Sequence, residues 1–209
     1  MQQELLPLFP LPVVLFPRTP LPLHIFEERY KVMIREVLES KTEFGVVLAG
    51  DKGIVNTGCT AMVEKVLKNY PDGRMDLMTE GRRRFEIILL NDEKPYLRGA
   101  VEFFDDEQFD AIAPEMQQRV LDSYKDVRRL EKTGEEENFE LSDPQLSFQL
   151  AQVVSDLDFR QVLLATRSEA GRMKRLAEFF PNYNSRQRQT LHMREIAPRN
   201  GHGKWPPAV

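Results

Sequence analysis

The three histidines are the first candidates for metal binding or acid–base chemistry, and they are His24, His192 and His202. Zinc hydrolases place two histidines one helical turn apart on a single helix face, whereas His24 is followed by Ile-Phe-Glu. His192 lies in a basic segment and His202 lies between two glycines, so neither has an acidic neighbour in the sequence to orient its ring. We therefore expect no metal site and no cofactor.

Nucleophilic residues are equally sparse. The single cysteine, Cys59, lies in a Gly-Cys-Thr run typical of the start of a strand, which favours a small core residue over a reactive thiol. A lone cysteine also fits a reducing compartment. No serine has the Gly-x-Ser-x-Gly setting of a hydrolase, and no glycine-rich loop ends in Gly-Lys-Ser/Thr to hold a phosphate. We expect a protein that is not an enzyme. An unrecognised hydrolase stays open as an alternative, because the serine and lysine of a dyad can be distant in the sequence.

Three consecutive arginines, Arg82, Arg83 and Arg84, precede Phe85 and form the strongest basic cluster. Arginines beside an aromatic ring can contact phosphate and stack on a base. Together with the basic C-terminal helices, they give RNA binding as an alternative function. Strand alternation would place Arg82 and Arg84 on one face and Arg83 with Phe85 on the other. One arginine would then pair with a carboxylate inside the protein, and we favour this structural interpretation.

The composition indicates a folded protein, because 41% of the 209 residues are hydrophobic and 30% are charged. Residues 160–209 hold ten Arg and Lys and three Glu, a formal charge of +7. Because the net charge of the whole chain is −4, residues 1–159 carry −11. This asymmetry favours complementarity between the two parts over a nucleic-acid footprint. Prolines interrupt the apolar segment 5–26, so it predicts neither a membrane span nor a leader, and we expect a cytoplasmic protein.

The first half of the chain has the pattern of a small β domain with one helix. A proline-rich run at 5–10 suits an edge strand, and the spacing of apolar residues predicts a helix over 24–40. The sequence Asn-Tyr-Pro-Asp-Gly at 69–73 predicts a hairpin turn. Apolar runs bounded by glycine or turn residues predict strands at 44–48, 59–66, 74–79, 84–90 and 96–103. We expect these strands to form a small, partly closed β-barrel.

The second half is predicted to be a helical bundle, so the fold class is α+β. Apolar residues recur at helical spacing from 112 to 127, and further helices are predicted over 142–155, 159–166, 168–180 and 186–197. Pro-Asn-Tyr-Asn at 181–184 separates the last two. The predicted division is a β domain over 1–107, a helical bundle over 108–198 and a flexible tail over 199–209.

Several short runs between residues 5 and 103 follow one another in a characteristic order. Residues 6–17 read Leu-Pro-Leu-Phe-Pro-Leu-Pro-Val-Val-Leu-Phe-Pro, and residues 21–30 read Leu-Pro-Leu-His-Ile-Phe-Glu-Glu-Arg-Tyr. Then come Phe-Gly-Val-Val-Leu at 44–48, Gly-Cys-Thr-Ala at 58–61, Asp-Gly-Arg-Met at 72–75, Gly-Arg-Arg-Arg-Phe at 81–85 and Tyr-Leu-Arg-Gly at 96–99. This series resembles the N-terminal, substrate-binding domain family of Lon proteases.

The resemblance implies a PUA-like pseudo-barrel followed by a helical bundle, and a role in recognising unfolded or tagged protein. It does not imply proteolysis, because the ATPase and Ser–Lys peptidase domains of Lon proteases come later in the chain, and this sequence ends at Val209. We expect a stand-alone, non-catalytic binding module, such as an adaptor in protein quality control. Its expected partners are unfolded or hydrophobic polypeptides, together with a protease or a chaperone, and neither nucleic acid nor a membrane.

Apolar side chains of the β domain are the candidates for peptide contacts, because flexible methionines and aromatic rings can adapt to varied partners. Such side chains are more often part of the core, and we favour that interpretation for each of them. The candidates are Phe9, Phe16, Tyr30, Met33, Met62, Met75 and Met78.

Overall fold

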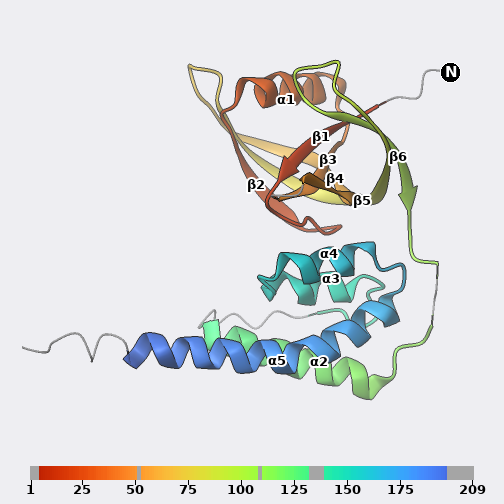
Figure 1. The fold of residues 1–209 in the computed structure, drawn as a ribbon, viewed down its shortest axis with the longest axis vertical. Coiled ribbons are helices and arrows are strands. Elements are labelled where there is room, and N and C mark those ends of the chain that lie inside the picture. The colour runs from red at the N-terminus through yellow and green to blue at the C-terminus, as the bar shows by residue number, and fades with distance from the viewer. Residues whose placement is uncertain (1–4, 51–52, 108–109, 132–138, 197–209) are drawn as a thin grey trace, which may run out of the picture. The chain divides into compact units, whose positions relative to one another are not determined.

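The computed structural model describes residues 5–50, 53–107, 110–131 and 139–196. Contacts divide the chain into two compact units (Figure 1). The β unit consists of residues 1–109 and 154–168, and the helical unit consists of residues 110–153 and 169–209. The segment 154–168 is part of the helical bundle in the division predicted from the sequence, whereas its contacts group it with the β unit. The predicted tail over 199–209 lies outside the described residues.

Six strands form one sheet in the β unit: β1 (Leu6–Leu11), β2 (Pro20–Ile25), β3 (Phe44–Gly50), β4 (Gly53–Asn69), β5 (Met75–Asn91) and β6 (Arg98–Phe104). Their order is β2-β5-β4-β3-β1-β6, and β6 also pairs with β5. This last pairing closes a ring of five strands and leaves β2 attached to β5 alone. Only β1 and β3 run parallel among the described pairs. The predicted α+β fold is confirmed.

The helix α1 (Glu28–Ser40) begins later than predicted. Residues from position 24 were expected to be helical, but His24 and Ile25 belong to β2, which pairs with β5 from Pro20 opposite Glu80 to Ile25 opposite Met75. Because β2 pairs with β5 alone, a proline in it need not interrupt a second ladder. The buried face of α1 has helical spacing and consists of Tyr30, Lys31, Met33, Ile34 and Val37.

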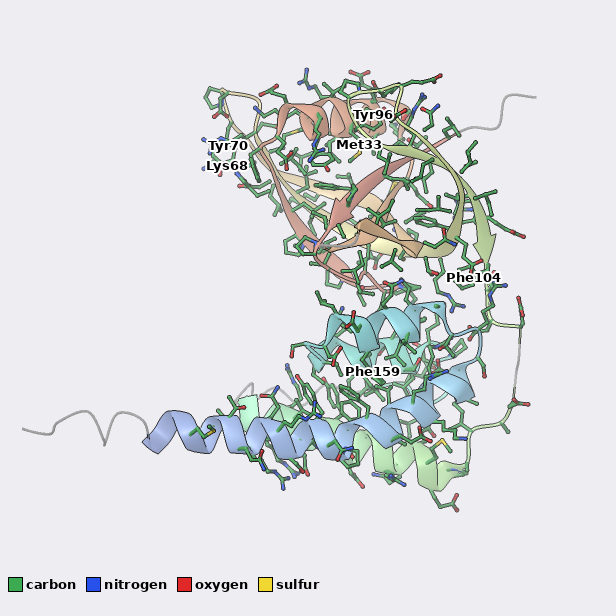
Figure 2. The ribbon with its side chains drawn as sticks, in the orientation of Figure 1. Met33, Lys68, Tyr70, Tyr96, Phe104 and Phe159 are labelled. Atoms are coloured by element: carbon green, nitrogen blue, oxygen red, sulfur yellow. The ribbon has the colours of Figure 1, made fainter. Side chains whose placement is uncertain are left out.

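The predicted hairpin connects β4 and β5. Tyr70 N–H donates to the Arg74 carbonyl at 2.9 Å, and Gly73 has a φ of +80°, a backbone conformation that glycine adopts without steric cost. Lys68 and Arg74 both lie over the Tyr70 ring, 4.4 and 4.9 Å from its centroid (Figure 2). The turn signal in the sequence is therefore confirmed, and the tip is further held by cation–π contacts.

The Phe85 ring occupies the middle of the β unit. It is fully buried and clusters with Leu8 and Val47. A Cβ atom at Gly45 would lie 2.6 Å from the ring, and one at Gly58 would lie 2.5 Å from it. These two glycines in β3 and β4 thus make the space that one large aromatic side chain fills.

A β-bulge corrects the predicted alternation of the arginine cluster. Gly81 pairs with Ala61 and Arg84 pairs with Cys59, so Arg82 and Arg83 together stand opposite the single residue between them on β4. Arg82 and Arg83 are consequently both exposed, whereas Arg84 is buried. The prediction that Arg82 and Arg84 share a face is wrong, because the extra residue resets the alternation.

Residues 154–168 are held to the β unit by side chains that donate to backbone carbonyls. Within them, α4 (Leu157–Ala165) contributes Arg160, which donates to the Val14 carbonyl at 2.9 Å, and Gln161, which donates to the Thr57 carbonyl at 2.9 Å. The Arg160 guanidinium also lies over a ring of the core, 4.8 Å from the centroid of Phe16. These bonds explain why a helix so late in the chain belongs to this unit.

Arg84 reaches the same segment from β5. Its guanidinium donates to the Thr166 carbonyl at 2.8 Å, to the Leu164 carbonyl at 3.3 Å and to the Asp106 carboxylate at 2.6 Å. Figure 2 shows Phe104 at the end of β6, and the guanidinium lies 4.7 Å from the centroid of this ring. The sequence predicts that one arginine of the cluster pairs internally with a carboxylate, and Arg84 does so.

The helical unit contains α2 (Pro114–Glu131), the short α3 (Leu146–Leu150), a 3₁₀ turn (Ala151–Val153) and α5 (Glu169–Ile196). The helix predicted over 142–155 is therefore much shorter. Buried residues of α2 are Val120, Leu121, Tyr124 and Val127, at the predicted spacing. None of the helices within the described ranges is long and apolar enough to cross a membrane.

The predicted break at Pro181 does not occur, because α5 runs through it. Proline lacks the N–H that would bond the carbonyl four residues earlier, here that of Ala177. Arg119 of α2 supplies the missing donor, since its guanidinium bonds the Ala177 carbonyl at 3.0 Å. Tertiary contact therefore compensates for a residue that would otherwise end the helix.

We expect Arg119→Ala to destabilise the protein, but much less so when it is combined with Pro181→Ala. The second substitution restores a backbone N–H that can bond the Ala177 carbonyl, which makes the guanidinium dispensable. The coupling energy should be about 1 kcal/mol, the net value of one such hydrogen bond. A double-mutant cycle by urea denaturation measures it, and additive effects of the two substitutions would show that Arg119 does not compensate for Pro181.

Candidate binding surface

Most of the peptide-binding candidates from the sequence lie in the core of the β unit. Phe16 and Met33 are fully buried, and Phe9, Tyr30 and Met75 expose 6% or less of their surface. Met62 and Met78 are half-buried. The five buried side chains cannot contact a peptide without opening the core, so of these candidates only Met62 and Met78 reach the surface.

The arginine cluster is occupied by intramolecular partners. Arg82 pairs with Glu64 and Glu80, and Arg83 pairs with Glu43. Arg83 also lies 3.8 Å from the centroid of the Phe103 ring, and Arg84 is held as described above. All three charges are therefore matched inside the β unit, so this cluster gives no support for nucleic-acid binding.

Cys59 and the buried serine Ser147 both lie in surroundings typical of residues that support the fold. Cys59 is fully buried, and desolvation raises the pKa of its thiol to about 12. Ser147 in the helical unit is also fully buried and donates to Glu169 at 2.6 Å, beside the guanidinium of Arg172. In the described residues, no group of three or more His, Cys, Asp or Glu side chains is arranged to hold a metal ion.

A polar network joins α1 to the segment before β6. Tyr96, which lies beside α1 in Figure 2, donates to the Glu36 carboxylate at 2.5 Å, and so does Lys94. The hydrogen bond from Lys94, followed by that from Tyr96, lowers the pKa of Glu36, and the bond to Glu36 raises the pKa of Lys94. The adjoining pocket of about 680 Å³ is lined largely by these and other polar groups, which are bonded to each other. The network thus fastens a loop and offers little apolar surface.

An exposed apolar strip lies at the C-terminal end of β5. Ile88, Leu89 and Leu90 expose 62%, 65% and 47% of their surface. Phe103 of β6, at 42%, and Val55 of β4, at 36%, are exposed in the same unit. Soluble proteins seldom leave several large apolar side chains exposed together unless they bind a partner. This strip is the best candidate for a binding surface.

The strip is absent from the candidates drawn from the sequence, where residues 84–90 are an ordinary predicted strand. A signal was present in Ile-Ile-Leu-Leu at 87–90, because a strand that buries one face needs apolar residues only at alternate positions. A second bulge adds to the effect, since Ile87 pairs with Val101 and Leu89 with Ala100, which leaves Ile88 as an extra residue.

The backbone of the strip is paired on one side only. β6 pairs with β5 as far as Asn91 opposite Arg98. On the other side, the last pair between β4 and β5 is Thr57 opposite Glu86, and the start of β4 pairs with β3 instead. Within the described part of the chain, residues 87–91 therefore have no strand along their β4 side.

A comparison with known protein families identifies the family of the chain. Residues 5–180 match the model of the ATP-dependent protease La (LON) substrate-binding domain. The chain belongs to this family. The match extends beyond the β unit into α5 and includes both units of the chain.

The chain is similar in sequence to several Lon proteases. The chain is 29% identical to Lon protease of Parabacteroides distasonis over 133 residues, which are 59% of this chain and 16% of that protein. It is 27% identical to Lon protease 2 of Herpetosiphon aurantiacus over 190 residues, 82% of this chain and 23% of that protein. The chain thus spans less than a quarter of these relatives.

Solved structures show the same fold. A Lon N-terminal domain protein from Xanthomonas campestris has a TM-score of 0.68 and 24% identity, covering 84% of this chain and 98% of that one. The N-terminal domain of a Mycobacterium avium complex Lon protease has a TM-score of 0.53 and 14% identity, covering 85% and 98%. Both confirm the Lon N-terminal fold of this substrate-binding family member.

Proposed function

We propose that this chain is a non-catalytic module that recognises unfolded polypeptide through the apolar strip of β5 and serves as an adaptor in protein quality control. The family supports substrate recognition. The exposure of Ile88, Leu89 and Leu90 is the observation that carries the proposal, because an unfolded segment offers the apolar side chains that would cover them. A protease or a chaperone is the partner that would receive the bound polypeptide.

Burial of the strip supplies part of the free energy of binding. Covering an exposed large aliphatic side chain contributes about 1.5 kcal/mol, so the three side chains together give about 4–5 kcal/mol before ordering costs. The micromolar binding that we expect needs about 8 kcal/mol, so further contacts along the bound polypeptide have to supply the rest.

We expect the double substitution Ile88→Ser/Leu90→Ser to weaken binding of a permanently unfolded protein by at least ~10-fold, because it removes most of the apolar contact. Leu67→Ser is the matched control, since Leu67 is also a half-exposed strand leucine, but lies near the hairpin tip. Fluorescence anisotropy with a reduced, carboxymethylated and labelled substrate measures both. Equal affinities of the two variants would refute the strip as the site.

The same preparation tests the alternatives. Casein should remain intact with this protein, with and without ATP, if the module is non-catalytic. Binding to unfolded protein should persist at moderate salt, whereas an RNA complex would weaken steeply as salt rises. Cleavage of casein, or selective and salt-sensitive retention of RNA, would replace the proposal by the corresponding alternative. The proposal also places the protein in the cytoplasm, so cell fractionation should recover it in the cytoplasmic fraction.

A further inference from the structure

The edge of β5 offers backbone groups for pairing in addition to apolar side chains. The inference drawn from these groups rests on the proposed function. Alternate residues of a strand direct their N–H and C=O groups to each side. Along residues 87–91 the groups that face β6 are paired, and those on the β4 side meet no strand in the described ranges. We infer that the polypeptide binds as an added strand, antiparallel or parallel, along this free edge of β5.

The divergence of β4 creates the free edge. Thr57, which pairs with Glu86, is the first residue of β4 that pairs with β5; the residues of β4 before it do not follow β5, and Gly53 and Ile54 pair with β3 instead. Gln161 of α4 donates to the Thr57 carbonyl at this point of separation. The edge is thus produced by the closed arrangement of the sheet and does not depend on a frayed terminus.

The residues on this edge favour pairing instead of preventing it. Natural edge strands are usually protected from a further strand by lysine, proline, inward charges or a β-bulge. Here Ile88, Leu89 and Leu90 occupy the edge, and only the bulge at Ile88 interrupts it. Backbone hydrogen bonds would give affinity for many sequences, and the exposed apolar side chains would select apolar residues in the added strand.

The charges around the strip define the partner further. Glu102 stands directly opposite Glu86 on the neighbouring strand. Arg167 pairs with Glu86 and Glu107, and no ion pair to Glu102 is formed by the described residues. Asp92, which is exposed, follows the end of β5. Arg98, opposite Asn91 at the same end, is matched by Glu93. Asp92 and Glu102 have no ion pair among the described residues, so the unmatched charges near the two ends are acidic, and they complement an extended segment with apolar residues between lysines or arginines.

This acidic rim distinguishes a foreign segment from a second copy of the chain. Two copies joined edge to edge along β5 would bring like charges together, which is destabilising for directly opposed residues. A basic–apolar segment of an unfolded polypeptide would instead gain from the same charges. The occupant is therefore an extended polypeptide of that composition.

The test uses short peptides with alternating valine and threonine between terminal lysines, with anisotropy as the measurement. Two variants carry N-methyl groups on alternate residues, one set for each edge of the peptide strand. Methylation of the edge that faces β5 should weaken binding about 10-fold or more, since it removes at least one hydrogen bond and adds a clash, whereas methylation of the outer edge should change it little. Equal binding of both methylated peptides would overturn strand addition.

The charge prediction has its own variant. Glu102→Lys/Asp92→Lys should reverse the preference for lysine-flanked over glutamate-flanked peptides, and an unchanged preference would overturn the acidic rim. Sedimentation of the free protein should give a monomer, since a dimer that dissociates on adding peptide would assign the edge to a second copy. Failure of strand addition is distinguishable from failure of the proposed function: in the first case unfolded protein still binds, and in the second it does not.

Discussion

Replacing Arg84 by methionine should lower the free energy of unfolding by about 3–5 kcal/mol, because it leaves buried partners of a charge unsatisfied. Arg84 exposes 4% of its surface. The Asp106 carboxylate and the carbonyls of Leu164 and Thr166 each accept a hydrogen bond from the guanidinium. Without Arg84 these acceptors would lose that donor. The segment 154–168 would lose its main attachment to β5.

Arg82→Met is the matched control for this change. Arg82 lies two residues away in β5 and pairs with Glu64 and Glu80, but it is exposed, so its pairs contribute only about 0–1 kcal/mol. Urea denaturation gives both free energies, and hydrogen exchange of residues 157–165 reports the local attachment. A loss below about 1 kcal/mol for Arg84→Met would show that the segment is held by its other contacts.

Gly81→Ala should destabilise the protein by roughly 3 kcal/mol, the upper end for overpacking, although it adds a single methyl group. A Cβ atom at Gly81 would lie 2.1 Å from the carbonyl oxygen of Phe16. The obstacle is backbone, and it cannot move away easily. Gly81 is itself bonded to this loop, since it donates to the Thr19 carbonyl at 2.9 Å and accepts from Arg18 N–H at 2.7 Å.

Gly50→Ala provides the comparison. Gly50 also lies in a strand of the β unit, but apart from its chain neighbours no atom of the described residues lies within 4 Å of the position that its Cβ would take. Its substitution should be nearly neutral by thermal or urea unfolding. Similar behaviour of Gly50→Ala and Gly81→Ala would mean that the loop at Phe16 yields to the methyl group and that the close approach is not required for the fold.

The candidate surface on β5 depends on which strands pair with β5, and these strands are distant in the sequence. Local sequence patterns therefore predict other residues as the binding surface. Met33 and Phe16 have the side chains of a binding surface and are fully buried. Leu89 belongs to a run that predicts a strand, and it is largely exposed. The local sequence around a hydrophobic residue looks the same whether its side chain is buried or exposed. Its exposure is set by whether another element covers it.

The sequence by itself determined what depends on neighbours along the chain and on the family motifs. The turn at 69–73 is set by proline and glycine, the burial of Tyr30, Met33 and Val37 in α1 by their helical spacing, and the family by motifs between residues 5 and 103. Tertiary structure decided what depends on distant partners. Arg119 lets α5 continue through Pro181, and the divergence of β4 from β5 before Thr57 leaves an apolar edge open, because backbone groups and apolar surfaces are satisfied by whatever the fold brings to them.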